Sequence, residues 1–356
     1  MNSNTLKLSS DMQNLKNDIL LIADEIVEMQ CNLQPSNENV GNQYSIEDTK
    51  YNIEYLFSAV LMGSKLIISE YIKWLYILLK NTKVPDETIE IFYQSTKEVL
   101  YKRVISKKIS LNTFDIIAEY IDAGIKSLKY DIKEPETFIY TDNPYFEQLN
   151  SYTKYILSAD KNSAVNVIKD MLSKNVSIKD FYKYIFQPFQ LELGRLWHLN
   201  KITVAKEHYS TATTQFIMSL LYEKIFKTKK NGNVFVGTCI NGELHELGIR
   251  MVCDYIESNQ WDTHYLGANM PDESIVQFAK DKLPDVIAIS CTMPFNIIKI
   301  EELIIKIRNA GLNSYIMVGG YPFNVDFELW KKVGADGYSK NFEEAYQKVQ
   351  SLDLKR

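Results

Sequence analysis

The sequence predicts a chain of mixed class, in which two helical parts precede an α/β part built on a doubly wound parallel sheet. Apolar residues recur three and four apart from about residue 46 to 133 and again from 145 to 227, as in amphipathic helices. After residue 233, short β-branched runs alternate with helical patterns, which is typical of a parallel sheet with crossover helices. A length of 356 residues suits two or three domains.

The first part is expected to be a polar segment followed by a helical domain. Residues 1–46 are rich in Asn, Ser and Gln; within them 10–30 has a helical pattern, and 31–46 is typical of a linker. Residues 47–135 have a helical pattern with many aromatic residues, which predicts a small N-terminal helical domain with an aromatic-rich interior. A turn-forming Glu-Pro-Glu cluster at 134–136 marks its end.

The second part, residues 140–229, is predicted to be a four-helix bundle. Its helical patterns are separated by short loops, so we expect successive helices to lie antiparallel. The four helices are expected at about 145–158, 161–174, 178–199 and 203–227.

The third part, residues 232–354, is predicted to be a parallel sheet of five strands joined by helices. Ligands of such sheets bind at the carboxyl ends of the strands, so the residues that follow each strand are the first candidates for a site. The expected strands are 234–238, 263–265, 286–290, 315–318 and 337–339, and the expected helices are 246–257, 272–280, 297–309, 326–332 and 342–351.

Composition excludes several classes of protein. Forty basic against forty-five acidic side chains give a net charge of −5, which argues against a protein whose whole surface binds nucleic acid. The four cysteines are far apart and form no CxxC pair, so neither a disulfide framework nor a zinc cluster is indicated. The N-terminus lacks a signal-peptide pattern, and no stretch is apolar enough to span a membrane. We expect a cytoplasmic protein with no direct contact to nucleic acid or membrane.

The histidines point to a metal site. All four lie between positions 198 and 264, and histidine is a common metal ligand. His245 is on the loop after the first strand, and Glu243 is placed to hydrogen-bond its imidazole, as carboxylates do behind metal-bound histidines. Gly248 leaves room for a bulky group beside the backbone. From spacing alone, His245 as a ligand and His245 as a helix-capping loop residue both stay open.

Two further strand ends carry small residues. The third strand ends in Ser290, with Thr292 two residues further on, and the fourth strand ends in Gly319 and Gly320. Together they are expected to form a slot against the sheet for a flat, long ligand, although each of these signals is also typical of an ordinary turn.

This pattern resembles the Rossmann-like cobalamin (vitamin B12)-binding domain of B12-dependent enzymes and receptors. It consists of Glu243-x-His245-x-x-Gly248, a serine after the third strand and Gly-Gly after the fourth. Glu243 stands where the family usually has Asp, as in its light-sensing branch, and Tyr265-Leu-Gly-x-x-x-Pro is also similar to that branch. The resemblance implies that His245 is the lower cobalt ligand. The nucleotide tail of the cofactor would then pass Gly248, Ser290, Gly319 and Gly320, and Thr292 is expected among the other cofactor-binding residues.

A second pattern lies in the bundle. Trp197-His198 ends the third helix, and Glu207-His208 begins the fourth after a short turn, so both pairs are expected at one end of the bundle. From the residues alone, packing and cofactor cover are equally open. The pattern resembles the adenosylcobalamin photoreceptors of the CarH type. The resemblance implies that Trp197 stacks over the adenosyl group and that Glu207 hydrogen-bonds it.

For the histidines of this part, the resemblance implies that His208 lines the same cap and that His198 takes the upper face of cobalt after illumination. His264 matches no motif, so we expect it to pack without a role.

The N-terminal part departs from the CarH type. Residues 1–135 have no MerR-like DNA-binding pattern, and their aromatic helices resemble standalone photoreceptors of the photocobilin type. That resemblance implies a possible second pigment, a bilin such as biliverdin. Aromatic residues at helical spacing are also typical of a protein core, so both interpretations stay open.

The leading hypothesis from the sequence is a light sensor rather than an enzyme. Photolysis of the cobalt–carbon bond of adenosylcobalamin would change the cap and, with it, a homo-oligomer or contact with an unknown protein partner. The first alternative is a corrinoid protein that carries methyl groups within a methyltransferase system. The second alternative is a cobalamin-storage or protein-interaction protein.

Overall fold

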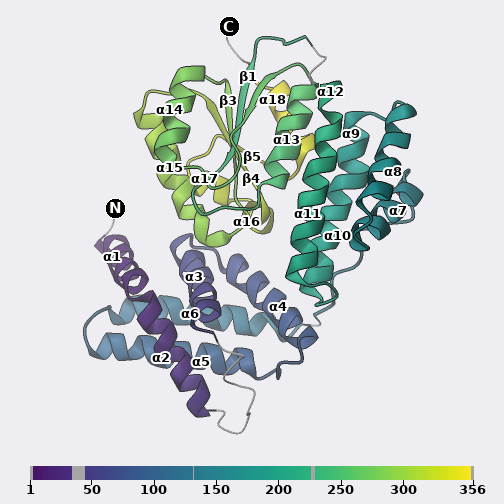
Figure 1. Cartoon of the computed structure of the whole chain (residues 1–356). Helices are drawn as coiled ribbons and strands as arrows, with labels where there is room; N and C mark the ends of the chain where they lie inside the picture. The colour runs from purple at the N-terminus through teal and green to yellow at the C-terminus, as the bar shows by residue number, and fades with distance from the viewer. Residues whose placement is uncertain (1–2, 34–44, 131, 226–228, 354–356) are drawn as a thin grey trace. The chain divides into compact units, whose positions relative to one another are not determined.

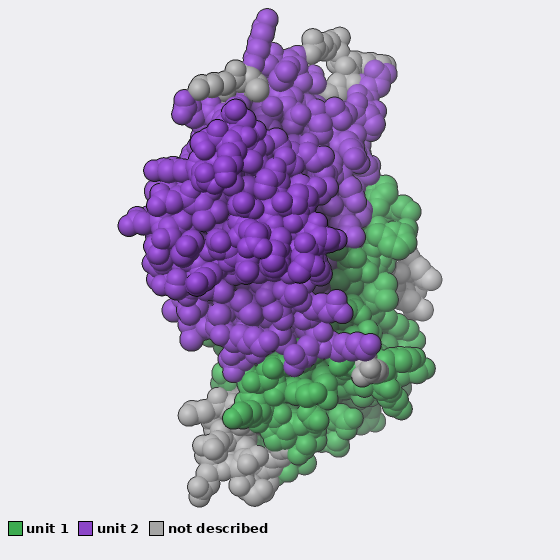
Figure 2. Space-filling view, turned by 90° about the vertical axis from the view of Figure 1, so that its right-hand side faces the viewer, with its two compact units in different colours: residues 1–132, 293–298, 324–333 green, residues 133–292, 299–323, 334–356 purple. Residues whose placement is uncertain are grey.

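A computed structural model describes residues 3–33, 45–130, 132–225 and 229–353 (Figure 1). The predicted fold class is confirmed, since helical parts precede a five-stranded, all-parallel, Rossmann-like sheet. The chain forms two compact units, shown in separate colours in Figure 2. The first contains residues 1–132, 293–298 and 324–333, and the second contains the rest.

The first unit is helical. Its helices are α1 (Ser3–Asn17), α2 (Ile19–Leu33), α3 (Ile46–Leu61), α4 (Lys65–Asn81), α5 (Thr88–Ile105) and α6 (Leu111–Ser127). The sequence predicts one helix over 10–30, whereas the structure has α1 and α2, with a break at Asp18. Met12 and Ile22 are fully buried, so both helices belong to the packed unit. Most of the predicted linker 31–46 lies outside the described residues.

Aromatic rings of the first unit stack on one another. The rings of Tyr55 and Tyr71 lie 3.8 Å apart at 13°, and Tyr71 and Trp74 lie 6.1 Å apart. Tyr71 donates its hydroxyl hydrogen bond to Asn52. Phe295, which follows the third strand in the chain, meets Tyr55 edge-on at 5.8 Å. These rings therefore pack on one another, with Tyr71 buried and Tyr55 and Trp74 half-buried.

The second unit begins with the bundle. Its helices are α7 (Phe146–Leu157), α8 (Lys161–Ser173), α9 (Ile178–Phe181), α10 (Gln187–His198), α11 (Val204–Met218) and α12 (Tyr222–Ile225), with a 3-10 turn, η3 (Ser219–Leu221), before α12. The predicted helix 178–199 is interrupted by a π-helical turn, η2 (Tyr182–Phe186). Pro188 causes this break, because it has no N–H for the carbonyl of Tyr184. Asn143 Nδ2 donates to that carbonyl instead, at 2.8 Å.

The sheet has strands β1 (Val234–Cys239), β2 (Asp262–Tyr265), β3 (Val286–Ser290), β4 (Tyr315–Gly319) and β5 (Gly337–Ser339) in the order β2-β1-β3-β4-β5. The order reverses between β1 and β3, which makes the carboxyl ends of these strands the expected ligand crevice. The helices after the strands are α13 (Leu247–Ser258), α14 (Asp272–Lys282), α15 (Ile297–Asn309), α16 (Tyr321–Val325), α17 (Leu329–Lys332) and α18 (Phe342–Gln350), with a 3-10 turn, η4 (Pro294–Asn296), before α15. In Figure 1, α13 and α18 cover one face of the sheet, and α14 and α15 cover the other.

One predicted helix of this part differs. The sequence predicts a helix over 326–332, whereas the structure has the two short helices α16 and α17. Pro322 lies in the first turn of α16, where its fixed φ favours a helix start. Asp326 Oδ1 then accepts from the backbone N–H of Glu328, which is the N-cap residue of α17.

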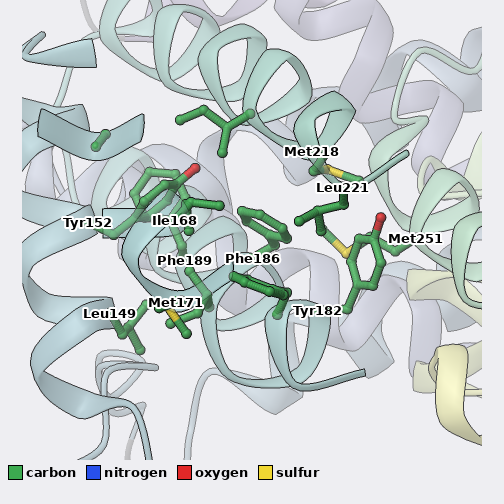
Figure 3. Close-up of a cluster of buried hydrophobic side chains, with 14 of the residues drawn as sticks. Leu149, Tyr152, Ile168, Met171, Tyr182, Phe186, Phe189, Met218, Leu221 and Met251 are labelled. Atoms are coloured by element: carbon green, nitrogen blue, oxygen red, sulfur yellow. The ribbon is translucent and has the colours of Figure 1, made fainter. Parts of the chain in front are cut away.

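The bundle and the sheet share one hydrophobic core. Tyr182 and Phe186 of the bundle belong to the same buried cluster as Met251 and Tyr255 of α13 and Phe342 of α18. Figure 3 shows Tyr182, Phe186 and Met251 converging within this cluster. The second unit is therefore held together by continuous apolar packing as well as by chain connectivity.

Polar residues at four-residue spacing on α13 add directional contacts to this core. The hydroxyl of Tyr182 donates to Asp254 Oδ2 at 2.7 Å, and Arg250 donates to the hydroxyl of Tyr222 at 3.0 Å. One turn earlier, Glu246 also contacts the bundle. Residues four apart lie on one face of a helix, so α13 presents a polar stripe beside its apolar contacts.

Burial raises the pKa of Asp254 from 3.8 to about 6, against the opposing hydrogen bond from Tyr182. Because the folded chain holds this proton more tightly than the unfolded chain, stability should fall as pH rises from about 4 to 6. Asp254→Asn keeps an acceptor for Tyr182 without a buried charge. We expect this variant to be more stable than the parent at pH 7 by about 1 to 3 kcal/mol, and equal to it near pH 4.

Urea unfolding at both pH values measures this difference, with the exposed Asp281→Asn as the matched control. Identical pH dependence of stability in Asp254→Asn and the parent would contradict the assignment.

Candidate functional site

A buried carboxylate organises the loop after β1. Glu243 has no exposed surface, and its Oε1 accepts from the backbone N–H of His245 at 3.1 Å and from His245 Nδ1 at 2.6 Å. Its Oε2 accepts from the backbone N–H of Thr292 at 2.8 Å. One side chain therefore orients the imidazole and ties the loop after β1 to the loop after β3.

The imidazole of His245 is exposed and electron-rich. Its side chain is 57% exposed, and the hydrogen bond to Glu243, with the charges of Glu243 and Glu207, raises the pKa of His245. Because Nδ1 donates to a carboxylate that can only accept, Nε2 is the nitrogen with a lone pair for a ligand. This arrangement matches that of metal-binding histidines with a carboxylate behind them.

The predicted strand-end residues are adjacent across the sheet. Ser290 is the register partner of both Cys239 at the end of β1 and Gly319 at the end of β4. A Cβ on Gly319 would lie 2.9 Å from the carbonyl oxygen of Ser339. The Gly-Gly pair is thus partly required by the crowding of the backbone itself.

Gly320 is the stricter of the two positions. It has φ +110°, and a Cβ there would lie 1.9 Å from the carbonyl oxygen of Cys291. Only glycine fits this backbone and this close approach. The sequence did not predict the contact with Cys291, which depends on the pairing of β3 with β4.

Gly248 and Gly194 differ from the crowded glycines. A Cβ at either position would meet no heavy atom of the described residues within 4 Å. Gly248 lies in the first turn of α13, and Gly194 lies in α10. Their backbones border open space, and the spacing of the sequence singled out only Gly248.

The four predicted cap residues of the bundle lie at one end of it, as expected, but their side chains differ in exposure. Trp197 is half-buried and His198 is buried at the end of α10, whereas the side chain of His208 is 76% exposed. His208 Nε2 lies 3.5 Å from Glu207 Oε2, and Glu207 Oε1 accepts from Thr211. Since the charge of Glu207 acts on His245, the structure brings Glu207 near the candidate ligand. The roles of all four residues stay predictions.

One residue of the site was missed. Glu246 accepts hydrogen bonds from Gln215 of α11 and Tyr265 of β2. The signal available in the sequence was an acidic residue directly after His245. His264, to which no role was assigned, has a side chain 22% exposed and its ring 5.5 Å from that of Phe278.

The chemistry of these donors fits a metal that carries most of its own ligands. The described residues contain no group of three or more His, Cys, Asp or Glu side chains that could hold a bare metal ion. A single exposed imidazole with a buried carboxylate behind it suits a metal centre that already has equatorial ligands, as in a corrin ring. Open space beside Gly248 suits a bulky cofactor.

The fold and this site define a corrinoid-binding class of protein, and comparisons with known proteins agree. Residues 233–348 and 148–222 each match a B12 binding domain family. Trimethylamine corrinoid protein 1 of Methanosarcina acetivorans is 31% identical over 170 residues, which are 46% of this chain and 75% of that protein. The chain therefore belongs to the family of B12-binding corrinoid proteins.

Other relatives are covered less fully. Dimethylamine corrinoid protein 2 of Methanosarcina mazei is 33% identical over 130 residues, 36% of this chain and 59% of the relative. The chain thus spans little more than half of this relative. The monomethylamine corrinoid protein of Methanosarcina barkeri has the same fold, with a TM-score of 0.52 at 19% identity, over 58% of this chain and all of that one.

These findings confirm that the chain binds cobalamin, but the light-sensor hypothesis is wrong. The relatives are corrinoid proteins named for methylamines, which favours the alternative of a methyl carrier. Nothing in them supports a photoreceptor, a signalling role or a bilin. The error has a physical cause: Trp197 and Glu207 lie at one end of the bundle, and their residue types do not identify the group that they would cover. No described helix is long and apolar enough to cross a membrane.

Glu243→Gln tests the electrostatics of the pair. Because the hydrogen bond to Glu243 is the main cause of the raised pKa of His245, this substitution should lower that pKa toward the usual value. An NMR titration of the imidazole resonances of the cofactor-free chain measures the change. The other three histidines, titrated in the same sample, are the internal control, and an unchanged His245 curve would contradict the geometry.

Proposed function

We propose that this chain is a corrinoid methyl carrier, a protein that holds a corrinoid for methyltransferase partners. The observation that carries the proposal is the Glu243–His245 pair at the switch point of the sheet. The names of the relatives, which are dimethylamine and trimethylamine corrinoid proteins, support the methyl-carrier function over light sensing and storage.

In this proposal, His245 would hold the cobalt of a bound corrinoid through its Nε2 atom. A bound corrinoid supplies a cobalt centre that takes up and gives away a methyl group. Glu243 holds the proton of Nδ1, keeps the ring in one orientation and increases the electron density on Nε2. Because Glu243 is also bound by the N–H of Thr292, the ring cannot turn without disturbing the loop after β3.

We assign the remaining site residues by their places around His245. The tail of the cofactor is proposed to run past Gly248, where a Cβ would meet open space, and along the strand ends. The bundle is proposed to cover the upper face, where we expect a methyl group in place of an adenosyl group. The tail-binding residues are Gly248, Ser290, Thr292, Gly319 and Gly320, and the covering residues are Trp197, His198, Glu207 and His208.

The proposed partners are methyltransferases that load and unload the methyl group. The four cysteines all lie within the described residues and form no disulfide. Cysteines that form no disulfide are typical of proteins in the reducing cytoplasm, where we propose that this chain acts.

Electron paramagnetic resonance of the bound cofactor tests the cobalt ligand. We load the chain with cob(II)alamin after labelling its histidines with ¹⁵N. Coordination by His245 should turn the nitrogen triplet into a doublet, and His245→Ala should abolish that doublet while the fold remains. The exposed His208→Ala is the control and should keep the doublet. A spectrum that is the same with and without ¹⁵N-labelled histidine would refute coordination of cobalt by a histidine of this chain.

A single-turnover experiment tests methyl transfer. The chain loaded with methylcobalamin is mixed with a thiol acceptor and a methyltransferase that transfers the methyl group from cobalt to the thiolate sulfur. The carbon–sulfur bond forms as the cobalt–carbon bond breaks, the electron pair stays on cobalt as cob(I)alamin, and the absorbance of the corrinoid is followed. A carrier should lose its methyl group within one turnover, and His245→Ala should lose it more slowly. A methyl–cobalt band that persists unchanged beside a fully active partner would speak against the carrier function and leave cofactor binding intact.

A further inference from the structure

The carboxylate of Glu246 joins three elements beside His245. Gln215 Nε2 of α11 donates to Glu246 Oε1 at 2.9 Å, and the hydroxyl of Tyr265 of β2 donates to Oε2 at 2.7 Å. Glu246 is also the N-cap residue of α13, yet among the described residues its side chain makes no capping bond to that helix. A carboxylate at this position ordinarily accepts from its own helix. Here both oxygens are used for tertiary contacts.

The contact with Gln215 orients one face of α11. Glu207, Thr211 and Gln215 are four residues apart and therefore lie on the same face of the helix. Thr211 donates to Glu207 at 2.8 Å. Gln215 lies about 12 Å further along the helix than Glu207, from the rise of an α-helix. The hydrogen bond from Gln215 to Glu246 therefore fixes the orientation of this face of α11 relative to the loop that carries His245.

Leu247, directly after Glu246, packs against the shared core, and the other polar contacts between α13 and the bundle lie further from His245. Arg250 and Asp254 are one and two turns beyond Glu246, and Met251 and Tyr255, which join the shared core, lie in those same turns. These contacts hold the bundle in place whether or not Glu246 is present. Loss of Glu246 should therefore alter the spacing at the His245 end without unfolding the unit.

We propose that Glu246 is a positioning residue, which fixes the spacing between α11 and the His245 loop and so sets how tightly the corrinoid is held. Tyr265 anchors the carboxylate to the sheet, and Gln215 transmits its position to the bundle. This inference rests on the proposed function, because it takes His245 as the cobalt ligand.

Cofactor titration of four variants tests the proposal. Glu246→Ala should weaken the binding of hydroxocobalamin about tenfold, as expected when charged hydrogen bonds that hold a site are lost. Gln215→Ala should weaken it in the same direction, and the double variant should be no worse than Glu246→Ala, because the two residues share one contact. Glu246→Gln should retain most of the affinity, since its amide can accept from Tyr265 and donate to a flipped Gln215 amide.

Arg250→Ala is the matched control, since it removes a polar contact of the same helix one turn away. It should lower the urea midpoint of unfolding and leave the dissociation constant for hydroxocobalamin unchanged. Hydrogen exchange of the cofactor-free chain gives a second measurement, in which Glu246→Ala should speed exchange in 204–218 more than Arg250→Ala does.

An unchanged dissociation constant in Glu246→Ala, or a loss that only follows lowered stability as in Arg250→Ala, would overturn the proposal. The ¹⁵N-histidine spectrum of the parent distinguishes failure of the proposed function from failure of the role of Glu246. If the parent shows no histidine doublet, the proposed function fails. If the doublet is present and Glu246→Ala binds as tightly as the parent, only the role of Glu246 fails.

Discussion

The site depends on one interaction, the buried carboxylate of Glu243. A charge without solvent is costly unless hydrogen bonds compensate it, and this one accepts from the N–H of Thr292 and from the N–H and Nδ1 of His245. Those donors come from the loops after β1 and β3, the two strands between which the order of the sheet reverses. The orientation of the imidazole and the spacing of the two loops are therefore set together.

The rest of the second unit supports this loop through α13. That helix begins directly after Glu246 and carries both the apolar residues that enter the bundle core and the polar stripe beside them. Since one helix both continues from the candidate ligand and packs against the bundle, the bundle and His245 share a common support. Because a corrin ring is rigid, a common support suits a site in which His245 and the bundle would both contact one corrinoid.

The wrong light-sensor hypothesis shows that residue type and spacing did not identify the bound group. Trp197 and Glu207 suggested cover for an adenosyl group, but the relatives with the same domains are named for methylamines. The aromatic helices suggested a pigment, which no comparison supports, and Tyr55, Tyr71 and Trp74 stack on one another. Residue type and spacing predict where side chains gather, whereas the group they enclose depends on shape and on partners.

The sequence by itself determined the five strands and most of the helices, because helical and strand periodicities are local, although it did not show where three predicted helices divide. It also determined the pairing of Glu243 with His245, which are two residues apart. Only the tertiary structure decided the contacts of Glu246, whose donors Gln215 and Tyr265 are 31 and 19 residues away. It also decided the pairing of Thr292 with Glu243 and the crowding of Gly320 by Cys291. Such contacts follow from strand order and helix packing, which local periodicity does not encode.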